Sequence, residues 1–550
     1  MIDIALLNRQ IEETLAQPES ADRELAVKRQ LGLRLVITTH SDQTVEDVRA
    51  AVGRFSPHFI VEDLFPASLF EKPADRAPDW SDFVFLAIVY GVAFTDVSEN
   101  PFDLAHDIKE AGRLVSVSPE FPVAAPPAME EVSVDEPGEE WGWEWKAMRV
   151  REAWDELQRL NIPLGKGITI AHPDCGWVEH KIWDTNTIDR TNARNFMPGE
   201  PLNDALERPG GAQPGHGLAT ASVMVAKYSL LPDTVSGVAP DATLLPIRCN
   251  DSVIIWAPGV ESLVIRAVRH AIDRKCQIIS ISMGGLYELG GPHPKGALAT
   301  IIQEAINANI IVVAAAGQDL WFEDYPTVTP ADGPQVIGVA GIEKTKVRYQ
   351  AWGRSCRNPY KSVKISAPAR RITKAASNGG FQVSEGTSYS TAFVAGIAAL
   401  WFSRHFPNGY PSNARVNAAV CFANHILDKA HIPPGFDEYF RGIIDAHALV
   451  TTRPNPYADP EEETDHRPSS LAILSRLIDR QDPAAADALI PPSTDEPYLR
   501  EMSMLMAADP ESRGGLAQLK SDGALNPQSF AALLAPKASR SLIHYLRSQG

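Results

Sequence analysis

The chain has 550 residues, of which 44% are hydrophobic, and this is enough apolar material for two or three folded domains. Its formal net charge of −18 argues against a nucleic-acid partner, since phosphate binding requires clustered lysine and arginine. No apolar stretch is long enough to span a membrane, so a membrane partner is not predicted either.

Two features of the sequence predict a cytoplasmic location. The N-terminal segment 1–10 lacks a basic start and a continuous apolar core, and its pattern predicts an amphipathic helix instead of a signal peptide. The 5 cysteines are odd in number and scattered, without CxxC or metal-binding spacing. Such a set is typical of buried thiols in a reducing compartment.

The first 123 residues are predicted to form a separate domain. Apolar residues with a period of two predict strands, and stripes with a period near 3.6 predict helices. In chain order the expected segments are a strand at 33–39, a helix at 44–52, strands at 58–65 and 83–90, a helix at 101–109 and a strand at 114–118. The resulting βαββαβ order is that of a ferredoxin-like fold.

A proline-containing, acidic stretch at 124–140 predicts an extended linker between this domain and the next. Four tryptophans follow closely, and we expect them to pack the first segment of the next domain onto its body: Trp141, Trp143, Trp145 and Trp154. Within 141–450, strand and helix patterns alternate, which predicts an α/β domain with a mostly parallel sheet and helices on both faces. The strands are expected at 168–171, 243–247, 277–282 and 310–315, and helices at 261–274 and 298–308.

The C-terminal part of the chain is predicted to be helical. Residues 451–467 are rich in proline and acidic side chains and predict a second linker, which leads to a helical region at 468–550. Helices are expected at 471–478, 484–489, 498–506, 530–534 and 538–546. This region carries no catalytic motif, so a protein-docking module and a stabilising appendage both remain open.

Three segments of the α/β domain carry the residue types that acyl transfer needs. Asp174 ends a strand pattern, His216 stands in a Gly-His-Gly turn before a helix of small residues, and Ser388 follows Gly-Thr at the start of an apolar helix. The N-terminus of a helix carries partial positive charge, which stabilises a developing oxyanion. Each residue alone is explained by ordinary capping or loop chemistry, but together they supply a nucleophile, a base and an orienting carboxylate.

Six blocks in this order resemble the subtilisin-like serine peptidases, the S8 family, over roughly 141–450. They are Asp174-Cys175-Gly176, His216-Gly217, Gly237-Val238-Ala239-Pro240, the run 280–285, the run 314–318, and Gly386-Thr387-Ser388. The chain order of Asp, His and Ser is also that of subtilisin. The resemblance implies a serine endopeptidase that acts on polypeptides, with Ser388 as nucleophile, His216 as general base and Asp174 as the residue that orients the base.

The resemblance also implies roles outside the triad. Gln318 stands where the family has an oxyanion-hole asparagine, and the substrate-binding residues would be Ser282, Met283, Gly284, Gly285, Ala316 and Gly317. The domain at 1–123 has the position and the element order of the family's propeptides, which are folding aids and inhibitors. The chain would then be a zymogen whose N-terminal domain is an intramolecular inhibitor, although a permanent regulatory domain of the same topology is an equal alternative.

Several departures from the family's pattern leave the function open. His172 and Pro173 interrupt the apolar strand before Asp174, and a changed backbone is expected there. The loop 230–234 lacks the asparagine-rich chemistry of the family's calcium site, so neither calcium nor another cofactor is predicted. Three interpretations remain: a serine endopeptidase, a transamidating relative that forms macrocycles, and a pseudoenzyme that binds without turnover.

Overall fold

The computed structural model describes the chain in segments. These are 33–40, 42–55, 59–66, 68–70, 84–89, 100–120, 142–208, 213–227, 235–253, 260–284, 296–318, 327–345, 348–353, 355–356, 363–437, 440–458, 489–490, 494, 498–499, 501–502, 505–506 and 510–549. Several predicted segments lie outside the described residues. They are the N-terminal helix, the linker 124–140, the loop 230–234, most of 451–467, the helix at 471–478 and the helix at 484–489 except for residue 489.

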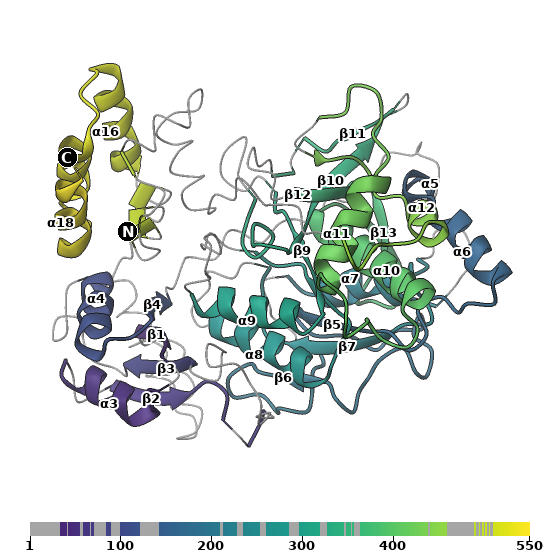
Figure 1. The fold of residues 1–550 in the computed structure, drawn as a ribbon, viewed down its shortest axis with the longest axis horizontal. Coiled ribbons are helices and arrows are strands. Elements are labelled where there is room, and N and C mark those ends of the chain that lie inside the picture. The colour runs from purple at the N-terminus through teal and green to yellow at the C-terminus, as the bar shows by residue number, and fades with distance from the viewer. Residues whose placement is uncertain are drawn as a thin grey trace.

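The N-terminal domain has the predicted βαββαβ order (Figure 1). Its four strands form an antiparallel sheet in the order β2-β3-β1-β4. The apolar face of β1 packs with both helices, and these contacts form a small core. The elements are β1 (Leu33–Thr38), α3 (Val45–Gly53), β2 (Phe59–Asp63), β3 (Val84–Val89), α4 (Pro101–Gly112) and β4 (Ser116–Glu120).

The second domain is built on a mostly parallel sheet, as predicted. Its strands follow the order β11-β10-β9-β8-β5-β7-β6, with β12 beside β10, and only β11 is antiparallel to its neighbour. The strands are β5 (Thr169–Asp174), β6 (Arg194–Asn195), β7 (Thr243–Arg248), β8 (Ile278–Ile281), β9 (Ile311–Ala315), β10 (Ile337–Lys344), β11 (Tyr349–Ala351) and β12 (Val363–Pro368). A hairpin of β13 (Ile372–Ala375) and β14 (Phe381–Ser384) lies outside this sheet.

Helices cover both faces of this sheet because successive side chains of a buried strand point to opposite sides. Ile278 packs with the helices α7 (His216–Val225) and α10 (Thr387–His405), whereas its neighbour Ile279 packs with α8 (Val260–Asp273) and α9 (Ala297–Asn307). The remaining helices of the domain are α5 (Trp143–Met148), α6 (Val150–Arg159), α11 (Ala418–Lys429) and α12 (Ala446–Thr451).

The tryptophans after the first linker pack α5 and α6 onto the domain, as expected from the sequence. Trp143 and Trp154 are buried in the same core as α7 and α10. Trp154 donates from its indole nitrogen to the carbonyl of Val238, 2.8 Å away, and Trp145 packs edge-on against it with ring centroids 4.9 Å apart. Trp141 lies outside the described residues.

The sheet of the N-terminal domain docks on the side of the second domain that carries α8 and α9 (Figure 1). Leu64 and Phe65 belong to the same apolar cluster as α8 and α9. At the start of α8, Arg34 donates to the hydroxyl of Ser262 at 2.9 Å, and Glu120 accepts from the Ser262 amide at 2.7 Å. Arg34 and Glu120 also form an almost fully buried ion pair at 2.9 Å.

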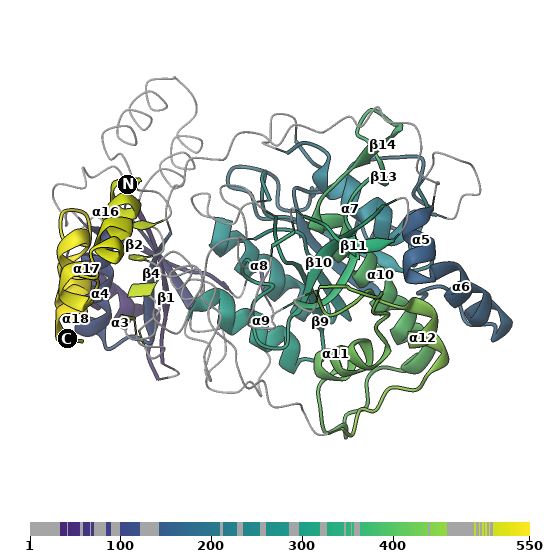
Figure 2. The same cartoon turned by 90° about the horizontal axis from the view of Figure 1, so that it is seen from above.

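The C-terminal region forms a small helical module with a core of its own. Its helices are α16 (Pro510–Ser521), α17 (Pro527–Leu534) and α18 (Arg540–Ser548), and the last two confirm the helices predicted at 530–534 and 538–546. The helix α16 was not predicted, because Gly514, Gly515 and several polar residues weaken its apolar periodicity. From the side and from above, the module lies next to α4 of the N-terminal domain (Figures 1 and 2).

The prediction of a changed backbone before Asp174 is wrong. The strand β5 runs without interruption from Thr169 to Asp174 and stays in parallel register with β7, including His172 and Pro173. Proline is tolerated because pairing with β8 on the other side ends at Ala171, so its missing amide proton interrupts no ladder there.

The cysteines agree with the expectation from composition. All 5 cysteines are free and buried, as the sequence predicts. Among the helices that the structure describes, none combines the length and the apolar character needed to cross a membrane.

Candidate active site

Asp174, His216 and Ser388 are placed by the ends of three buried elements. Asp174 is the last residue of β5, His216 is the first residue of α7, and Ser388 is the second residue of α10. Ligands of open parallel sheets bind outside the carboxyl ends of the strands, which is where Asp174 lies. The first turn of a helix leaves amide groups without intrahelical partners, and Ser388 lies in such a turn.

Asp174 and His216 form a directly bonded pair. The Nδ1 atom of His216 lies 2.9 Å and 3.0 Å from the two carboxylate oxygens of Asp174, and the Cys175 amide donates to the same carboxylate at 2.7 Å. Asp174 is fully buried, whereas His216 keeps some access to solvent. Burial alone would raise the pKa of Asp174, but the charge of His216 and hydrogen bonds from His172 and His216 outweigh it and hold that pKa well below its usual range.

The glycine after His216 allows this pair to form. A Cβ atom at Gly217 would lie 1.9 Å from the carbonyl oxygen of Gly176 and 3.3 Å from a carboxylate oxygen of Asp174. Any side chain there would push the start of α7 away from the end of β5. The His-Gly pair is therefore explained by close packing against the Asp174 loop.

A second imidazole, which the sequence analysis left without a role, also contacts Asp174. His172 is buried, and its Nε2 atom lies 3.4 Å from Asp174 and 3.0 Å from the hydroxyl of Thr220 on α7. Its Nδ1 atom has no hydrogen-bond partner. With a proton on Nε2, the ring can donate toward Asp174 and the Thr220 hydroxyl. The spacing of two residues along a strand, which puts both side chains on one face, is the signal that could have revealed this contact.

Ser388 faces the loop after β8 and is not hydrogen-bonded to His216. Its hydroxyl donates to the carbonyl of Ser282 at 3.4 Å, and the Ser282 hydroxyl donates to the carbonyl of Ser388 at 3.2 Å. The turn that carries Ser388 is thus hydrogen-bonded to the segment to which the family resemblance assigns substrate binding. Catalytic hydrogen bonds are often long or misaligned in the absence of substrate, so this geometry is compatible with a nucleophile.

Gln318 lies next to the turn 386–388. It follows β9 and forms an isolated bridge with Ser355, and its carboxamide oxygen would lie 3.4 Å from a Cβ atom built on Gly386. The side chain therefore reaches the turn that precedes Ser388. Of the other residues assigned to substrate binding, Ser282, Met283 and Gly284 follow β8, Ala316 and Gly317 follow β9, and Gly285 lies outside the described residues.

A buried arginine supports the Asp174 loop from behind, and the sequence analysis missed it. Arg248 ends β7 and donates to the carbonyl of Cys175 at 2.6 Å. It also forms two hydrogen bonds of 2.9 Å with the carboxylate of Glu200 and an ion pair of 2.7 Å with Asp251. Cys175 and Glu200 are far from Arg248 in sequence, so no local pattern predicts these two contacts.

The described residues contain one group with potential for metal binding, formed by Asp174, Cys175 and His216, whose ligand atoms lie within 4.8 Å of one another. The carboxylate and the imidazole already bond to each other. Burial, together with the negative charge of Asp174, raises the pKa of the Cys175 thiol, so the thiolate that metals prefer is disfavoured. The cluster is therefore explained by the Asp–His pair without a metal.

The comparison with family models decides the classification. The subtilase family model, peptidase S8, matches residues 165–440, which is half of the chain and includes all three candidate catalytic residues. The chain belongs to the subtilase family.

Individual relatives of this subtilase match parts of it. Subtilisin E of Bacillus subtilis is 28% identical over 245 residues, which cover 44% of this chain and 55% of subtilisin E. Mycosin-1 of Mycobacterium tuberculosis is 28% identical over 349 residues, which cover 54% of this chain and 72% of mycosin-1. The match with subtilisin E thus spans about half of that protein's length.

A solved structure agrees with the fold. The crystal structure of fervidolysin from Fervidobacterium pennivorans, a keratinolytic enzyme related to subtilisin, matches with a TM-score of 0.53 and 19% sequence identity. The match covers 76% of this chain and 61% of fervidolysin. This similarity supports the subtilisin-like fold and carries no information on substrate.

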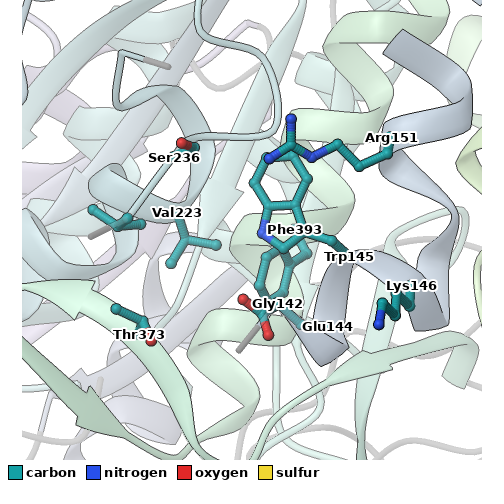
Figure 3. Close-up of a pocket in the computed structure, with 10 residues that line it drawn as sticks. Gly142, Glu144, Trp145, Lys146, Arg151, Val223, Ser236, Thr373 and Phe393 are labelled. Atoms are coloured by element: carbon teal, nitrogen blue, oxygen red, sulfur yellow. The ribbon is translucent and has the colours of Figure 1, made fainter. Parts of the chain in front are cut away.

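A cavity of about 140 Å³ lies between the helices α7 and α10 on one side and α5 and α6 on the other (Figure 3). Val223 of α7 and Phe393 of α10 form one side, and Glu144, Trp145 and Arg151 of α5 and α6 form another. The guanidinium of Arg151 lies over the Trp145 ring, 5.3 Å from its centroid. Glu144 is 6% exposed, and burial raises its pKa to about 7.

The raised pKa of Glu144 predicts a pH-dependent stability. Between about pH 4.5 and pH 7 the folded chain keeps a proton that the unfolded chain releases, so the free energy of unfolding should fall as pH rises through this window. Glu144→Gln should remove that fall and stabilise the protein at pH 8, by up to about 3 kcal/mol, with little effect at pH 4.5. Urea unfolding at both pH values measures this difference.

The matched control is Glu152→Gln, because Glu152 is an exposed glutamate on the neighbouring helix α6. This variant should keep the wild-type dependence on pH. An equal decline of stability from pH 4.5 to pH 8 in wild type and Glu144→Gln would contradict the prediction.

Proposed function

We propose that this subtilase is a serine endopeptidase that hydrolyses peptide bonds through an acyl-enzyme on Ser388. The observation that carries the proposal is the hydrogen-bonded pair of His216 with the fully buried Asp174. Because Nδ1 of His216 donates to Asp174, its Nε2 atom is available as an acceptor for the serine proton. Family membership supports the same chemistry.

The proposed reaction assigns one step to each group. The Oγ atom of Ser388 attacks the peptide carbonyl while His216 takes its proton, and a tetrahedral oxyanion forms. His216 then gives the proton to the leaving amine, the C–N bond breaks, and the acyl group stays on Ser388. Water, deprotonated by His216, attacks this ester and releases the second product. Asp174 holds the imidazole in its tautomer and stabilises the imidazolium.

The substrate of the proposed reaction is an extended polypeptide. The segment Ser282–Gly284 leaves the end of β8 beside Ser388, and this position supports its proposed pairing with a substrate strand. A Cβ atom at Gly284 would lie 2.2 Å from the Val328 side chain, so this segment is closely packed against its neighbours. Ala316 and Gly317 would form a wall of the first specificity pocket.

The N-terminal domain is proposed to be the enzyme's intramolecular inhibitor. Its support is the buried contact of Arg34 and Glu120 with the start of α8, together with its ferredoxin-like order. The zymogen state follows from this role. The cytoplasmic location stays a prediction, with the buried free cysteines as its support.

The nucleophile is tested by covalent labelling. A fluorophosphonate probe should label the wild-type protein, and Ser388→Ala should lose both the label and peptide hydrolysis, the latter by about 10⁶-fold in kcat. His216→Ala should have the same effect on hydrolysis. Mass spectrometry of the products should show free carboxyl and amine ends. Ser384→Ala is the control, because this serine lies on the hairpin β14 and has no role in the reaction.

Retention of hydrolysis by purified Ser388→Ala would refute the proposed mechanism. Products joined by new amide bonds would support the transamidating interpretation. A protein that binds unfolded polypeptide and reacts with neither probe nor substrate would be the pseudoenzyme.

His172 is predicted to orient and polarise Asp174 in the proposed reaction. Without its hydrogen bond, the Asp174 charge stabilises the imidazolium of His216 more strongly. His172→Val should therefore move the acid limb of the kcat/KM profile to higher pH. Because Asp174, and with it His216, would also be held less firmly in position, kcat should fall by about tenfold with KM unchanged. His172→Gln, whose amide can donate from a similar position, should restore both. A pH profile identical to wild type would show that His172 only fills space.

Gln318 is predicted to donate to the oxyanion together with the amide of Ser388. Removing such a donor lowers kcat by about 10²- to 10³-fold, and Gln318→Ala should do so with little change in KM. Gln318→Glu has nearly the same shape but no amide donor, and it should be at least as slow. Steady-state kinetics with a small amide substrate measures both parameters. Full activity of Gln318→Ala would remove this residue from the mechanism.

A further inference from the structure

The first turn of α18, in the C-terminal module, is capped by a residue of the N-terminal domain. Asp103 of α4 accepts from the amides of Arg540 and Ser541 at 3.0 Å and 3.1 Å, and from the Ser541 hydroxyl at 2.8 Å. The next amide, of Leu542, is capped within the module by Ser539. The free amides of a helix start need acceptors, and a carboxylate there also interacts favourably with the helix dipole. The amides of Arg540 and Ser541 have Asp103 as their acceptor only while the N-terminal domain and the module are in contact.

Two further contacts surround this cap. Asn100, which caps the start of α4, also donates to Glu501 of the module at 3.4 Å. One turn further along α4, the His106 ring stacks on Tyr498 with centroids 4.5 Å apart. Tyr498 in turn stacks on Tyr545 of α18 at 4.6 Å, so the contact continues into the module. The module therefore contacts one face of α4 through a charged residue, hydrogen bonds and stacked rings.

The carboxyl groups at this contact have different ionisation. Burial tends to raise the pKa of Asp103, but hydrogen bonds from Arg540 and Ser541 outweigh it and lower that pKa, so Asp103 is charged at neutral pH. Burial raises the pKa of Glu501 to about 7, and its oxygens accept from the amide and hydroxyl of Ser539. Asp103 is therefore the charged acceptor of the contact, and its removal should weaken the contact most.

The N-terminal domain lies between two partners. Its sheet side contacts α8 through Arg34, Glu120 and Leu64, whose carbonyl accepts from Arg266, and its helix α4 contacts the module. Figures 1 and 2 both show the module next to α4 of this domain. The module is joined covalently to the peptidase, since both follow the first linker in the chain. A cut in that linker would therefore leave the N-terminal domain bound at two sites of one chain.

We propose that the C-terminal module is a docking module whose partner is the chain's own N-terminal domain, and that it retains this domain on the peptidase after the linker 124–140 is cut. Two linked sites on one chain raise the effective concentration of the released domain, which typically strengthens binding by about 10²- to 10⁴-fold over one site. The role of the retained domain as inhibitor rests on the proposed function, but its retention does not.

Release of the cut domain tests the proposal in the full chain carrying Ser388→Ala, so that the chain cannot cut itself. A recognition sequence for a specific external protease is placed within 124–140, the chain is immobilised at its C-terminus, and it is cut and washed. The N-terminal domain should stay bound, whereas Asp103→Ala should release it at least tenfold faster. Asp107→Ala should match wild type, because this aspartate is exposed on the same helix.

Two additional variants separate docking from misfolding. Asp103→Asn keeps the shape of the side chain and lowers only its charge and accepting capacity, and Ser541→Ala removes one donor on the module side. Both should release the domain faster than wild type without changing its circular dichroism. Release at the wild-type rate by Asp103→Ala and Asp103→Asn would overturn the proposal, as would immediate loss of the cut domain from the unsubstituted chain. Because the nucleophile is absent, neither outcome depends on whether the protein is a peptidase.

Discussion

The constraint on which the rest of this structure depends is the burial of one charge, that of Asp174 at the end of β5. A carboxylate without access to water is stable only when hydrogen-bond donors replace its hydration. The Cys175 amide, His216 and His172 supply these donors from β5 and α7. The start of α7 must therefore approach β5 closely, and this is possible because Gly217 has no side chain. The same burial fixes the imidazole of His216 in one orientation.

The parts predictable from sequence are those whose signal is local. Buried parallel strands such as β8 and β9 are short, continuous apolar runs, and they were predicted to within one residue at each end. The ferredoxin-like order followed from periodicity alone, although its sheet order depends on pairing between distant strands. The candidate catalytic residues were found because each stands at an element boundary with a glycine within two residues of it.

The contacts that were not predicted join residues distant in sequence. Arg248 reaches Glu200 across 48 positions, and Asp103 reaches Ser541 across 438. Such pairs produce no periodicity in the sequence, since each member looks like an ordinary polar or charged surface residue in its own segment. His172 is the exception, because its spacing from Asp174 on a strand was readable. The sequence instead suggested that His172 and Pro173 interrupt the strand, because a histidine and a proline are unusual in a buried strand.

The two contacts of the N-terminal domain differ in kind. On the peptidase side, Leu64 and Phe65 enter a large apolar cluster, which supplies most of the favourable free energy of docking. The buried pair of Arg34 and Glu120 adds little net stability, because the cost of removing both charges from water offsets their attraction. Removing either partner would leave the other as a buried charge without a counter-ion. It therefore fixes the position of the domain on α8. The contact with the module is smaller and depends on charged and aromatic groups around Asp103. The stronger contact with α8 and the weaker contact with the module together hold the N-terminal domain. Because the two contacts are separate, either one can open while the other stays closed.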